Sequence, residues 1–353
     1  MDPTILRKLE HIRICLEEDV ELGESFLDDV TLMHQCLPEQ RLEDVDTSSN
    51  FLGKRLELPL VIAALTGGCQ EAEPINRALA AVAARTGIAF GVGSQRAMLE
   101  TPALLPTFSV RDVAPDILLL GNLGITAIRK YPPEKVHEAV RAIGADALCV
   151  HINAAQELFQ AEGDVDFGSC SEALRALCRE APYPVIAKEV GCGISRESAL
   201  ALQASGVSAI DVGGRGGTSW VLVDSIRSGR DATRFLSWGI PTAVSLLEAR
   251  AAALPLIATG GVRNGLQMAN AIRLGADVCG IALPFLRVLH REGEEGLERY
   301  VNGLKRDFSF ALYLTGAKNV AEFRTKGFVL GSRILQWAQQ RCLPLPMLSP
   351  APL

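Results

Sequence analysis

The chain has 353 residues, of which 48% are hydrophobic and 22% charged, a balance that is ordinary for a globular protein. Its net charge of −6 argues against a general nucleic-acid-binding protein, because the phosphate backbone attracts basic surfaces. No apolar run is long enough for a membrane span, the N-terminal stretch lacks a signal-peptide core, and nine scattered cysteines form no CxxC pair, so we expect a cytoplasmic protein without membrane contact.

The predicted elements begin with a charged amphipathic helix at about residues 4–22, inside an N-terminal extension of residues 1–57. Eight short apolar runs follow, and such runs are typical of strands buried on both faces of a parallel sheet. The predicted strands are Leu58–Leu65, Ile88–Val92, Ile117–Asn122, Ala147–Asn153, Val185–Val190, Ala209–Gly213, Leu256–Thr259 and Val278–Leu283. Helical patterns fill most gaps, at Pro74–Arg85, Pro133–Ile143, Ser171–Glu180, Ser195–Ala204, Thr242–Ala253 and Gly265–Leu274.

Eight strand–helix alternations favour a closed TIM (β/α)₈ barrel over an open doubly wound sheet. A barrel of this type needs about 250 residues, so we expect a single domain over 1–353, with the barrel at 58–318 and a C-terminal tail at 319–353. Residues 294–340 are predicted to be helices that close around the barrel. Residues 219–240 are an insertion after strand six, which is either a lid, a subunit contact made by Trp220, Phe235 and Trp238, or a disordered loop.

Glycine-rich segments follow the last three strands, at Gly213–Thr218, Thr259–Gly265 and Gly280–Pro284. In this fold the loops after strands seven and eight commonly bind phosphate. A backbone without side chains can approach phosphate oxygens and offer its N–H groups, and Arg263 adds a forked donor. Tight turns alone would also explain the glycines, but their recurrence after three neighbouring strands favours a phosphate site.

Lys188 ends strand five inside an apolar run. A buried ammonium group is costly unless it meets an anion or several acceptors. The adjacent Glu189 points to the opposite face of the strand, so a flavin or a substrate anion is the expected partner. Thr66, Ser94 and Asn122 add polar groups around the same mouth, although these residue types are also common in turns.

The segment HINAAQE ends strand four, with His151 and Asn153 on one strand face and Gln156 and Glu157 expected on the following loop. Glu157 is a candidate Mg²⁺ ligand, because Mg²⁺ takes few carboxylates and completes its shell with water and substrate phosphates. A solvated loop carboxylate is the alternative.

Several motifs in one order along the chain resemble the type 2 isopentenyl-diphosphate isomerases, flavin-dependent enzymes of isoprenoid biosynthesis. They are RKxxxH (7–11), LTGG (65–68), GSQR (93–96), GNLG (121–124), HxNxxQE (151–157), KEVGxG (188–193), GGTSW (216–220) and GGVR (260–263). The resemblance extends from Arg7 to about Lys318.

The resemblance implies interconversion of isopentenyl and dimethylallyl diphosphate, with FMN kept reduced by NADPH, with Mg²⁺ and with no net redox change. It implies substrate contacts at Arg7, Lys8, His11, Ser94, Gln95, Arg96, His151, Asn153 and Gln156, and Mg²⁺ at Glu157. It implies FMN contacts at Ala64, Leu65, Thr66, Ser94, Asn122, Lys188, Thr218, Gly261, Val262, Arg263, Ala282 and Leu283.

The family usually has Met at the position of Leu65, a swap of similar volume that flavin binding should tolerate. Because Arg7 and Lys8 precede the barrel, the extension must fold over the barrel mouth. A homo-oligomer, a tetramer or octamer, is also implied. Reduced FMN is expected to be the main acid and base, with Gln156, His151 and Asn153 beside it.

Two alternatives stay open. A 2-hydroxy-acid oxidase needs a His base beside an Arg clamp near a late strand, and Gly213–Thr218 contains no His. A flavin-binding protein without catalysis would need neither Gln156 and Glu157 nor the cations Arg7 and Lys8.

Overall fold

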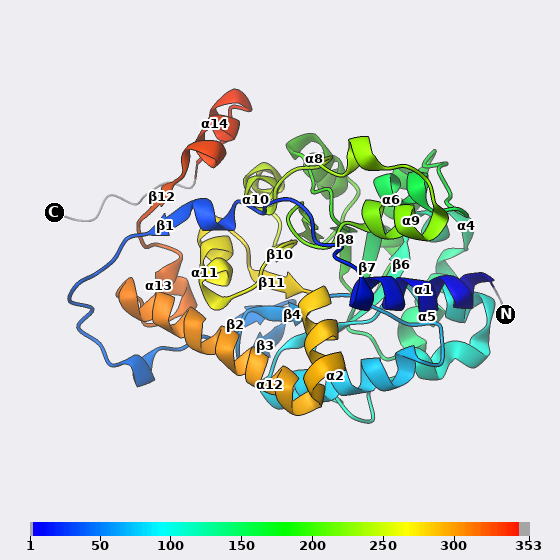
Figure 1. Ribbon diagram of the computed structural model, residues 1–353, viewed down its shortest axis with the longest axis horizontal. Coiled ribbons are helices and arrows are strands. Elements are labelled where there is room, and N and C mark those ends of the chain that lie inside the picture. Colours follow the sequence, from blue (N-terminus) through cyan, green and yellow to red (C-terminus); the bar gives the residue numbers. More distant parts are fainter. Residues whose placement is uncertain (1–2, 346–353) are drawn as a thin grey trace.

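The computed structural model describes residues 3–345 (Figure 1). Eight parallel strands form a closed barrel in which each strand pairs with its neighbours in chain order, so the predicted TIM barrel is confirmed. The strands are β4 (Leu60–Ile62), β5 (Ala89–Gly91), β6 (Leu119–Gly124), β7 (Ala147–Ile152), β8 (Val185–Glu189), β9 (Ala209–Asp211), β10 (Leu256–Thr259) and β11 (Val278–Ile281). Most are shorter than the apolar runs that predicted them. Residues 63–65, for example, leave the sheet after β4 and line the barrel mouth.

The barrel interior is a packed apolar core that is closed at one end. Val61, Leu120 and Ile257 belong to this interior cluster, together with Phe51 and Leu56 from a hairpin that precedes the barrel. The hairpin is formed by β2 (Ser49–Phe51) and β3 (Lys54–Leu56). It lies where the barrel strands begin, because Lys54 donates to the carbonyl of Asp116, which precedes β6. The open end is therefore the one where the strands finish.

Helices surround the barrel and bury a second, larger core against it. The long ones are α2 (Ala72–Thr86), α5 (Pro133–Ala142), α7 (Cys170–Glu180), α8 (Arg196–Ala204), α10 (Thr242–Ala249), α11 (Gly265–Leu274) and α12 (Leu283–Leu314), which is kinked at Gly293. Three short helices had not been predicted: α3 (Arg96–Glu100), α4 (Ile125–Lys130) and α6 (Ala154–Phe159). In the described part of the chain no helix combines the length and apolarity that a membrane crossing requires.

The N-terminal helix α1 (Pro3–Glu17) is shorter than predicted, because the chain beyond it pairs with a barrel loop. The N–H of Ser219 donates to the carbonyl of Val20 at 2.8 Å, and the N–H of Leu22 donates to Gly217 at 3.1 Å. Helix α1 packs on α12 and on α9 (Trp220–Ser228) through a small apolar cluster.

The predicted insertion contains α9 and a short 3₁₀ turn, η4 (Thr233–Phe235). Ser219 starts α9 as its cap, since its hydroxyl accepts the N–H of Leu222. The insertion is therefore an ordered element packed against α1 and α6, and the disordered-loop alternative is wrong. Its Trp238 is nevertheless 63% exposed.

The end of the chain differs from the predicted run of closing helices. After α13 (Val320–Phe323), strand β12 (Phe328–Leu330) pairs antiparallel with β1 (Val30–Leu32), and α14 (Ser332–Gln340) follows. Figure 1 shows this small sheet at the edge of the barrel, beside α11. A strand of three residues whose partner lies near the other end of the chain has no local pattern that predicts it.

Candidate active site

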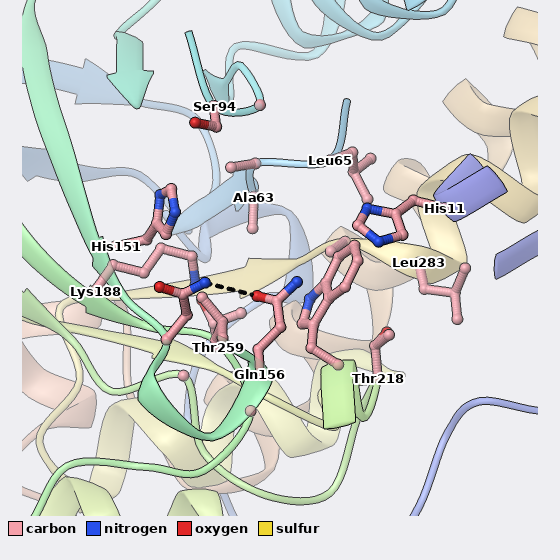
Figure 2. Close-up of a pocket in the computed structure, with 18 of the residues that line it drawn as sticks. His11, Ala63, Leu65, Ser94, His151, Gln156, Lys188, Thr218, Thr259 and Leu283 are labelled. Atoms are coloured by element: carbon pink, nitrogen blue, oxygen red, sulfur yellow. Dashed lines mark hydrogen bonds between the residues drawn. The ribbon is translucent and has the colours of Figure 1, made fainter. Parts of the chain in front are cut away.

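A cavity opens where all eight barrel strands end, beneath α1, α9 and the first turn of α12 (Figure 2). Its empty space, with the open mouth included, is about 1560 Å³. Figure 2 shows His11 and Leu283 on one side and His151 and Lys188 on the other, with Gln156 and Thr259 between them. The sequence-predicted site residues that line it are Arg7, Lys8, His11, Ala64, Leu65, Thr66, Ser94, Arg96, Asn122, His151, Asn153, Gln156, Glu157, Lys188, Thr218, Gly261, Arg263, Ala282 and Leu283.

Two predicted site residues do not line the cavity. The side chain of Gln95 is fully buried, donates to the carbonyl of Ala139 at 2.8 Å and accepts the N–H of Asn122 at 3.0 Å. It ties the loop after β5 to β6 and α5, so this amide does not face the cavity. Val262 is also fully buried among apolar neighbours, whereas the adjacent Gly261 lines the cavity.

One half of the cavity is built from glycine backbone and two unpaired hydroxyls. Within residues 3–345, the buried Oγ1 atoms of Thr66 and Thr259 have no hydrogen-bond partner, and both residues line the cavity. A side chain on Gly217 would come within 2.7 Å of the N–H nitrogen of Gly261, so these two loops touch through their backbones. Unsatisfied buried polar groups are rare, so these hydroxyls suit the polar atoms of a ligand. The glycine backbone suits a phosphate, to which it can offer N–H groups. FMN, a planar polar ring with a phosphate, fits both features. Thr259 had been predicted only as the first residue of the phosphate-binding segment Thr259–Gly265, without a role for its hydroxyl.

Lys188 has a protein partner that the sequence reasoning did not identify. Its Nζ lies 2.9 Å from the carboxylate of Asp211 and donates to the carbonyl of Glu189 at 2.9 Å. Lys188 and Asp211 stand opposite each other in the parallel register of β8 and β9. An external anion is thus not required to bury this ammonium group, which corrects the expectation. One of its three N–H donors remains for a ligand in the cavity.

His151 is held as a neutral imidazole. Burial and the nearby cations Lys8 and Lys188 lower its pKa to about 3. Its Nδ1 lies 2.8 Å from Oδ1 of Asn122, an acceptor, so Nδ1 carries the proton and Nε2 is left as an acceptor. Gly124 makes room for the ring, because a side chain there would come within 2.9 Å of Nε2.

Gln156 lies in the first turn of α6, not on a loop as predicted, and hydrogen bonds hold both ends of its amide. Its Oε1 accepts from Asn153 at 3.1 Å, the dashed line in Figure 2, and its Nε2 donates to Asp224 at 2.8 Å. The side chain therefore has one orientation, fixed by an amide on one side and a carboxylate on the other.

Asp224 is the principal residue that the sequence reasoning missed. It is fully buried in α9 and accepts from His11 Nε2 at 2.9 Å, from Gln156, and from Arg227 Nε at 3.2 Å. A carboxylate within the apolar stretch WVLVD was the available signal, because a buried charge requires partners. It joins α1, α6 and α9 at one point.

The α1 side of the cavity is strongly basic. Arg7, Lys8 and His11 line it, and Arg96 faces them from α3. Burial and the adjacent Arg7 lower the pKa of Lys8 to about 8, and burial also lowers the pKa of Arg7. Each of these cations disfavours the protonated form of the other, and a bound polyanion would relieve this repulsion.

Glu157 is buried, so the alternative of a solvated loop carboxylate is wrong. Its Oε1 accepts from Asn153 at 2.8 Å, and its Oε2 accepts the N–H of Asp164 at 2.7 Å and the amide of Gln160 at 3.3 Å. These donors are neutral, so the negative charge of the carboxylate is not cancelled by them. Across residues 3–345 no group of three or more His, Cys, Asp or Glu residues could hold a metal ion.

Comparisons with known proteins agree with this geometry. Residues 132–329, more than half of the chain, match the model of a family described as FMN-dependent dehydrogenase. Isopentenyl-diphosphate delta-isomerase from Methanoregula boonei is 43% identical over 94% of this chain and 96% of its own length. The enzyme of the same name from Pyrococcus abyssi is also 43% identical, over 96% of each chain.

Solved structures of low sequence identity show the fold. A mandelate oxidase with (S)-2-phenylpropionate has a TM-score of 0.65 at 20% identity, over 91% of this chain and 94% of its own. A flavocytochrome b2 variant with sulfite bound has a TM-score of 0.69 at 18% identity, over 92% and 83%. With 43% identity to these isomerases over nearly its whole length, the chain belongs to the isopentenyl-diphosphate delta-isomerase family, of the FMN-dependent type.

Proposed function

We propose that this protein interconverts isopentenyl diphosphate and dimethylallyl diphosphate in isoprenoid biosynthesis, with reduced FMN, Mg²⁺ and NADPH as reductant. The observation that carries the proposal is the division of one cavity into two halves. Unpaired threonine hydroxyls and glycine backbone suit a flavin, and the cations of α1 suit a diphosphate. Flavin binding alone would require only the first half.

The flavin would be held by residues at the ends of several strands. Gly261, Arg263 and the first turn of α12 suit its phosphate, since a helix N-terminus and backbone N–H groups favour anions. The remaining donor of Lys188 and the hydroxyls of Thr66 and Thr259 suit the polar edge of the ring. When bound and reduced, FMN supplies an electron-rich planar surface with exchangeable protons that can face an alkene.

The reaction adds a proton at one carbon of the alkene and removes a proton from another. Arg7, Lys8 and Arg96 would offset the diphosphate charge, so that remote binding energy orients the reacting carbons. Glu157 would hold Mg²⁺ with one carboxylate, and water and diphosphate oxygens would complete the shell. Its neutral partners support this role, because its charge is left to attract a cation.

Gln156 would orient the substrate, and Asp224 would act as its positioning residue. The amide of Gln156 is a poor acid, so it ranks second to the flavin in proton transfer. His151 is neutral and its Nε2 is an acceptor, which suits a hydrogen bond to a donor in the cavity more than a charge contact with the diphosphate. Asn153 would act mainly by holding Gln156 and Glu157.

A homo-oligomer, a tetramer or octamer, and a cytoplasmic location complete the proposal. The exposed aromatic side chains of Phe235 and Trp238, next to the cavity, support a contact with a second copy. Nine cysteines without a disulfide within residues 3–345 suit a reducing compartment.

The test is an anaerobic assay of the purified protein with isopentenyl diphosphate, Mg²⁺, FMN and NADPH. We expect dimethylallyl diphosphate to form, and to form only when a reductant is present. A parallel assay with lactate and mandelate tests the oxidase alternative, which predicts flavin reduction by the hydroxy acid. A yellow protein that converts neither substrate would contradict the proposal and favour a non-catalytic flavin-binding protein.

A further inference from the structure

Two arginines converge on one carboxylate just outside the lining of the cavity. Glu21 forms an ion pair with Arg263, and its second oxygen lies 3.6 Å from Nη1 of Arg287. The exposed fractions of the three side chains are 27%, 32% and 20%, so solvent screens these contacts only in part.

The two arginines belong to different parts of the site. Arg263 follows β10, lines the cavity and is the residue proposed to hold the flavin phosphate. Arg287 lies on α12, where its Nε donates to the carbonyl of Cys15 at 3.1 Å and its Nη2 donates to the carbonyl of Glu18 at 2.7 Å. Those carbonyls belong to the C-terminal end of α1, which needs donors and favours a cation.

Glu21 lies within a strap, residues 20–25, that connects these parts. The strap follows α1 directly and hydrogen-bonds to the backbone of the loop after β9, at Gly217 and Ser219. Contact is close, because a side chain on Gly216 would come within 2.4 Å of the backbone nitrogen of Ser25. The strap therefore holds Glu21 beside both the loop after β9 and the end of α1.

We propose that Glu21 is a positioning residue that links occupancy of the flavin phosphate site to the seating of α1, and so of Arg7 and Lys8, over the substrate. Without a phosphate, two guanidinium groups share the single carboxylate. A phosphate monoester adds a charge of about −1.5 to −2, which offsets Arg263. Glu21 is then free to pair more closely with Arg287, and the cap on α1 tightens.

The link rests on the proposed function, because it assigns the phosphate of FMN to Arg263. It goes beyond that function by making the cofactor phosphate an effector of the substrate-binding helix. Coupling between two sites is reciprocal, so a diphosphate held by α1 would also tighten FMN. The link is carried by a single side chain, which makes it separable from direct contacts between the flavin and α1.

The experiment compares FMN with riboflavin, which has the same ring but no phosphate. Hydrogen–deuterium exchange is measured in residues 3–17 of the full-length apoprotein, with each flavin at saturation. In the wild type we expect FMN to slow exchange in α1 by about five-fold or more relative to riboflavin, the lower end of ordinary coupling energies. In Glu21→Gln, FMN still binds, but it slows exchange in α1 no more than riboflavin does.

A second readout separates positioning from general stability. With reduced FMN saturating, Glu21→Gln should raise the KM for isopentenyl diphosphate several-fold and change kcat little. Glu18→Gln is the matched control, because it removes the same charge from an exposed side chain and keeps the carbonyl that Arg287 binds. Arg287→Gln breaks the same link from the other side, and it decides the question if Glu21→Gln does not fold.

The link is overturned if FMN protects α1 in Glu21→Gln as it does in the wild type, or if riboflavin protects wild-type α1 as well as FMN does. Failure of the proposed function looks different. A wild-type protein that binds FMN and shows the protection, but does not isomerise the substrate, refutes the proposed reaction and leaves the link standing.

Discussion

The two halves of the cavity are built in different ways. The flavin half consists of backbone and small side chains at the ends of β4 and of β8 to β11, and its shape depends on how closely glycine loops approach each other. The diphosphate half consists of long charged side chains from α1, α3 and α9, and its shape depends on a hydrogen-bond network centred on Asp224. The first half is thus a property of the barrel, and the second is a property of the elements added to it.

The difference matters for binding energy. The loops of the flavin half already touch through their backbones, so little further ordering is needed when a flat ligand enters. In the diphosphate half, burial and mutual repulsion both destabilise the charged forms of the cations. The pKa of about 8 for Lys8 reflects both effects. A polyanion would offset more of this cost than a monoanion, so we expect selectivity for diphosphates over monoanionic acids.

The largest effect on the flavin half is expected from Gly261→Ala. Gly261 has a φ of +77°, and a Cβ there would lie 2.3 Å from the carbonyl oxygen of Gly216. The strained backbone alone costs about 1–3 kcal/mol, and the collision forces the two loops apart. We expect FMN binding to weaken by at least ten-fold, which flavin absorbance of the purified protein and a fluorescence titration would measure.

Gly53→Ala is the matched control for this substitution. Gly53 has a similar φ of +81°, but no atom lies within 4 Å of the added Cβ. It therefore carries the backbone cost without the collision, and FMN binding should stay at the wild-type level. Equal loss of FMN in both variants would show that close approach of the loops does not shape the flavin half.

The barrel was predictable because its signal is local. A run such as Leu256–Thr259 is apolar, short and followed by glycine, and the structure gives β10 the same bounds. The ends of the chain were not predictable in this way. Strand β12 depends on β1, and the helix predicted at 4–22 stops at Glu17 because residues after it pair with the loop at Gly217 and Ser219.

The same contrast between local signals and distant partners applies to the residues of the site. Lys188 and Thr66 stand where strand ends were expected, so the sequence placed them at the barrel mouth. Asp224 and Asp211 were not predicted as site residues. The role of each depends on a side-chain partner from another element, which its own position in an apolar run does not indicate. Gln95 was assigned to the substrate by its place in a motif, and no local pattern indicated that its amide would bind the backbone of α5 and not line the cavity.

Asp224→Asn should produce the largest effect on the diphosphate half, and its effect should be confined to that half. An asparagine offers one oxygen where three donors now converge, so it brings an N–H group toward another donor, although Arg227 keeps its pair with Glu162. A buried donor left without an acceptor costs about 1–3 kcal/mol. We expect kcat to fall by roughly a hundred-fold, measured in the anaerobic assay, with FMN affinity unchanged within error. Loss of FMN would mean that the halves are not independent.

The pH dependence of KM tests the charge state of Lys8. Its pKa is about 8 in the free cavity, and a bound diphosphate favours the protonated form. Binding is therefore strongest below pH 8 and weakens as pH rises above it, by up to about ten-fold per pH unit. His151 does not contribute to this limb, because its pKa is about 3. Lys8→Arg should remove the rise in KM, and a limb that persists in this variant would assign it to another group.

The smallest effect is expected from Glu162→Gln, at the rim of the same network. Glu162 pairs with Arg227, as Asp224 does, but its side chain is 44% exposed whereas that of Asp224 is fully buried. Exposed ion pairs contribute only about 0–1 kcal/mol, so kcat, KM and the melting temperature should stay close to the wild type. Because both carboxylates share one guanidinium, the pair of variants separates the ion pairs of Arg227 from the hydrogen bonds that only Asp224 makes, to His11 and Gln156. Suppose instead that Glu162→Gln lowers kcat as much as Asp224→Asn does. Substrate binding in the diphosphate half would then depend on net charge and not on buried hydrogen bonds. The role of Asp224 would be to hold Arg227 in place and not to position Gln156.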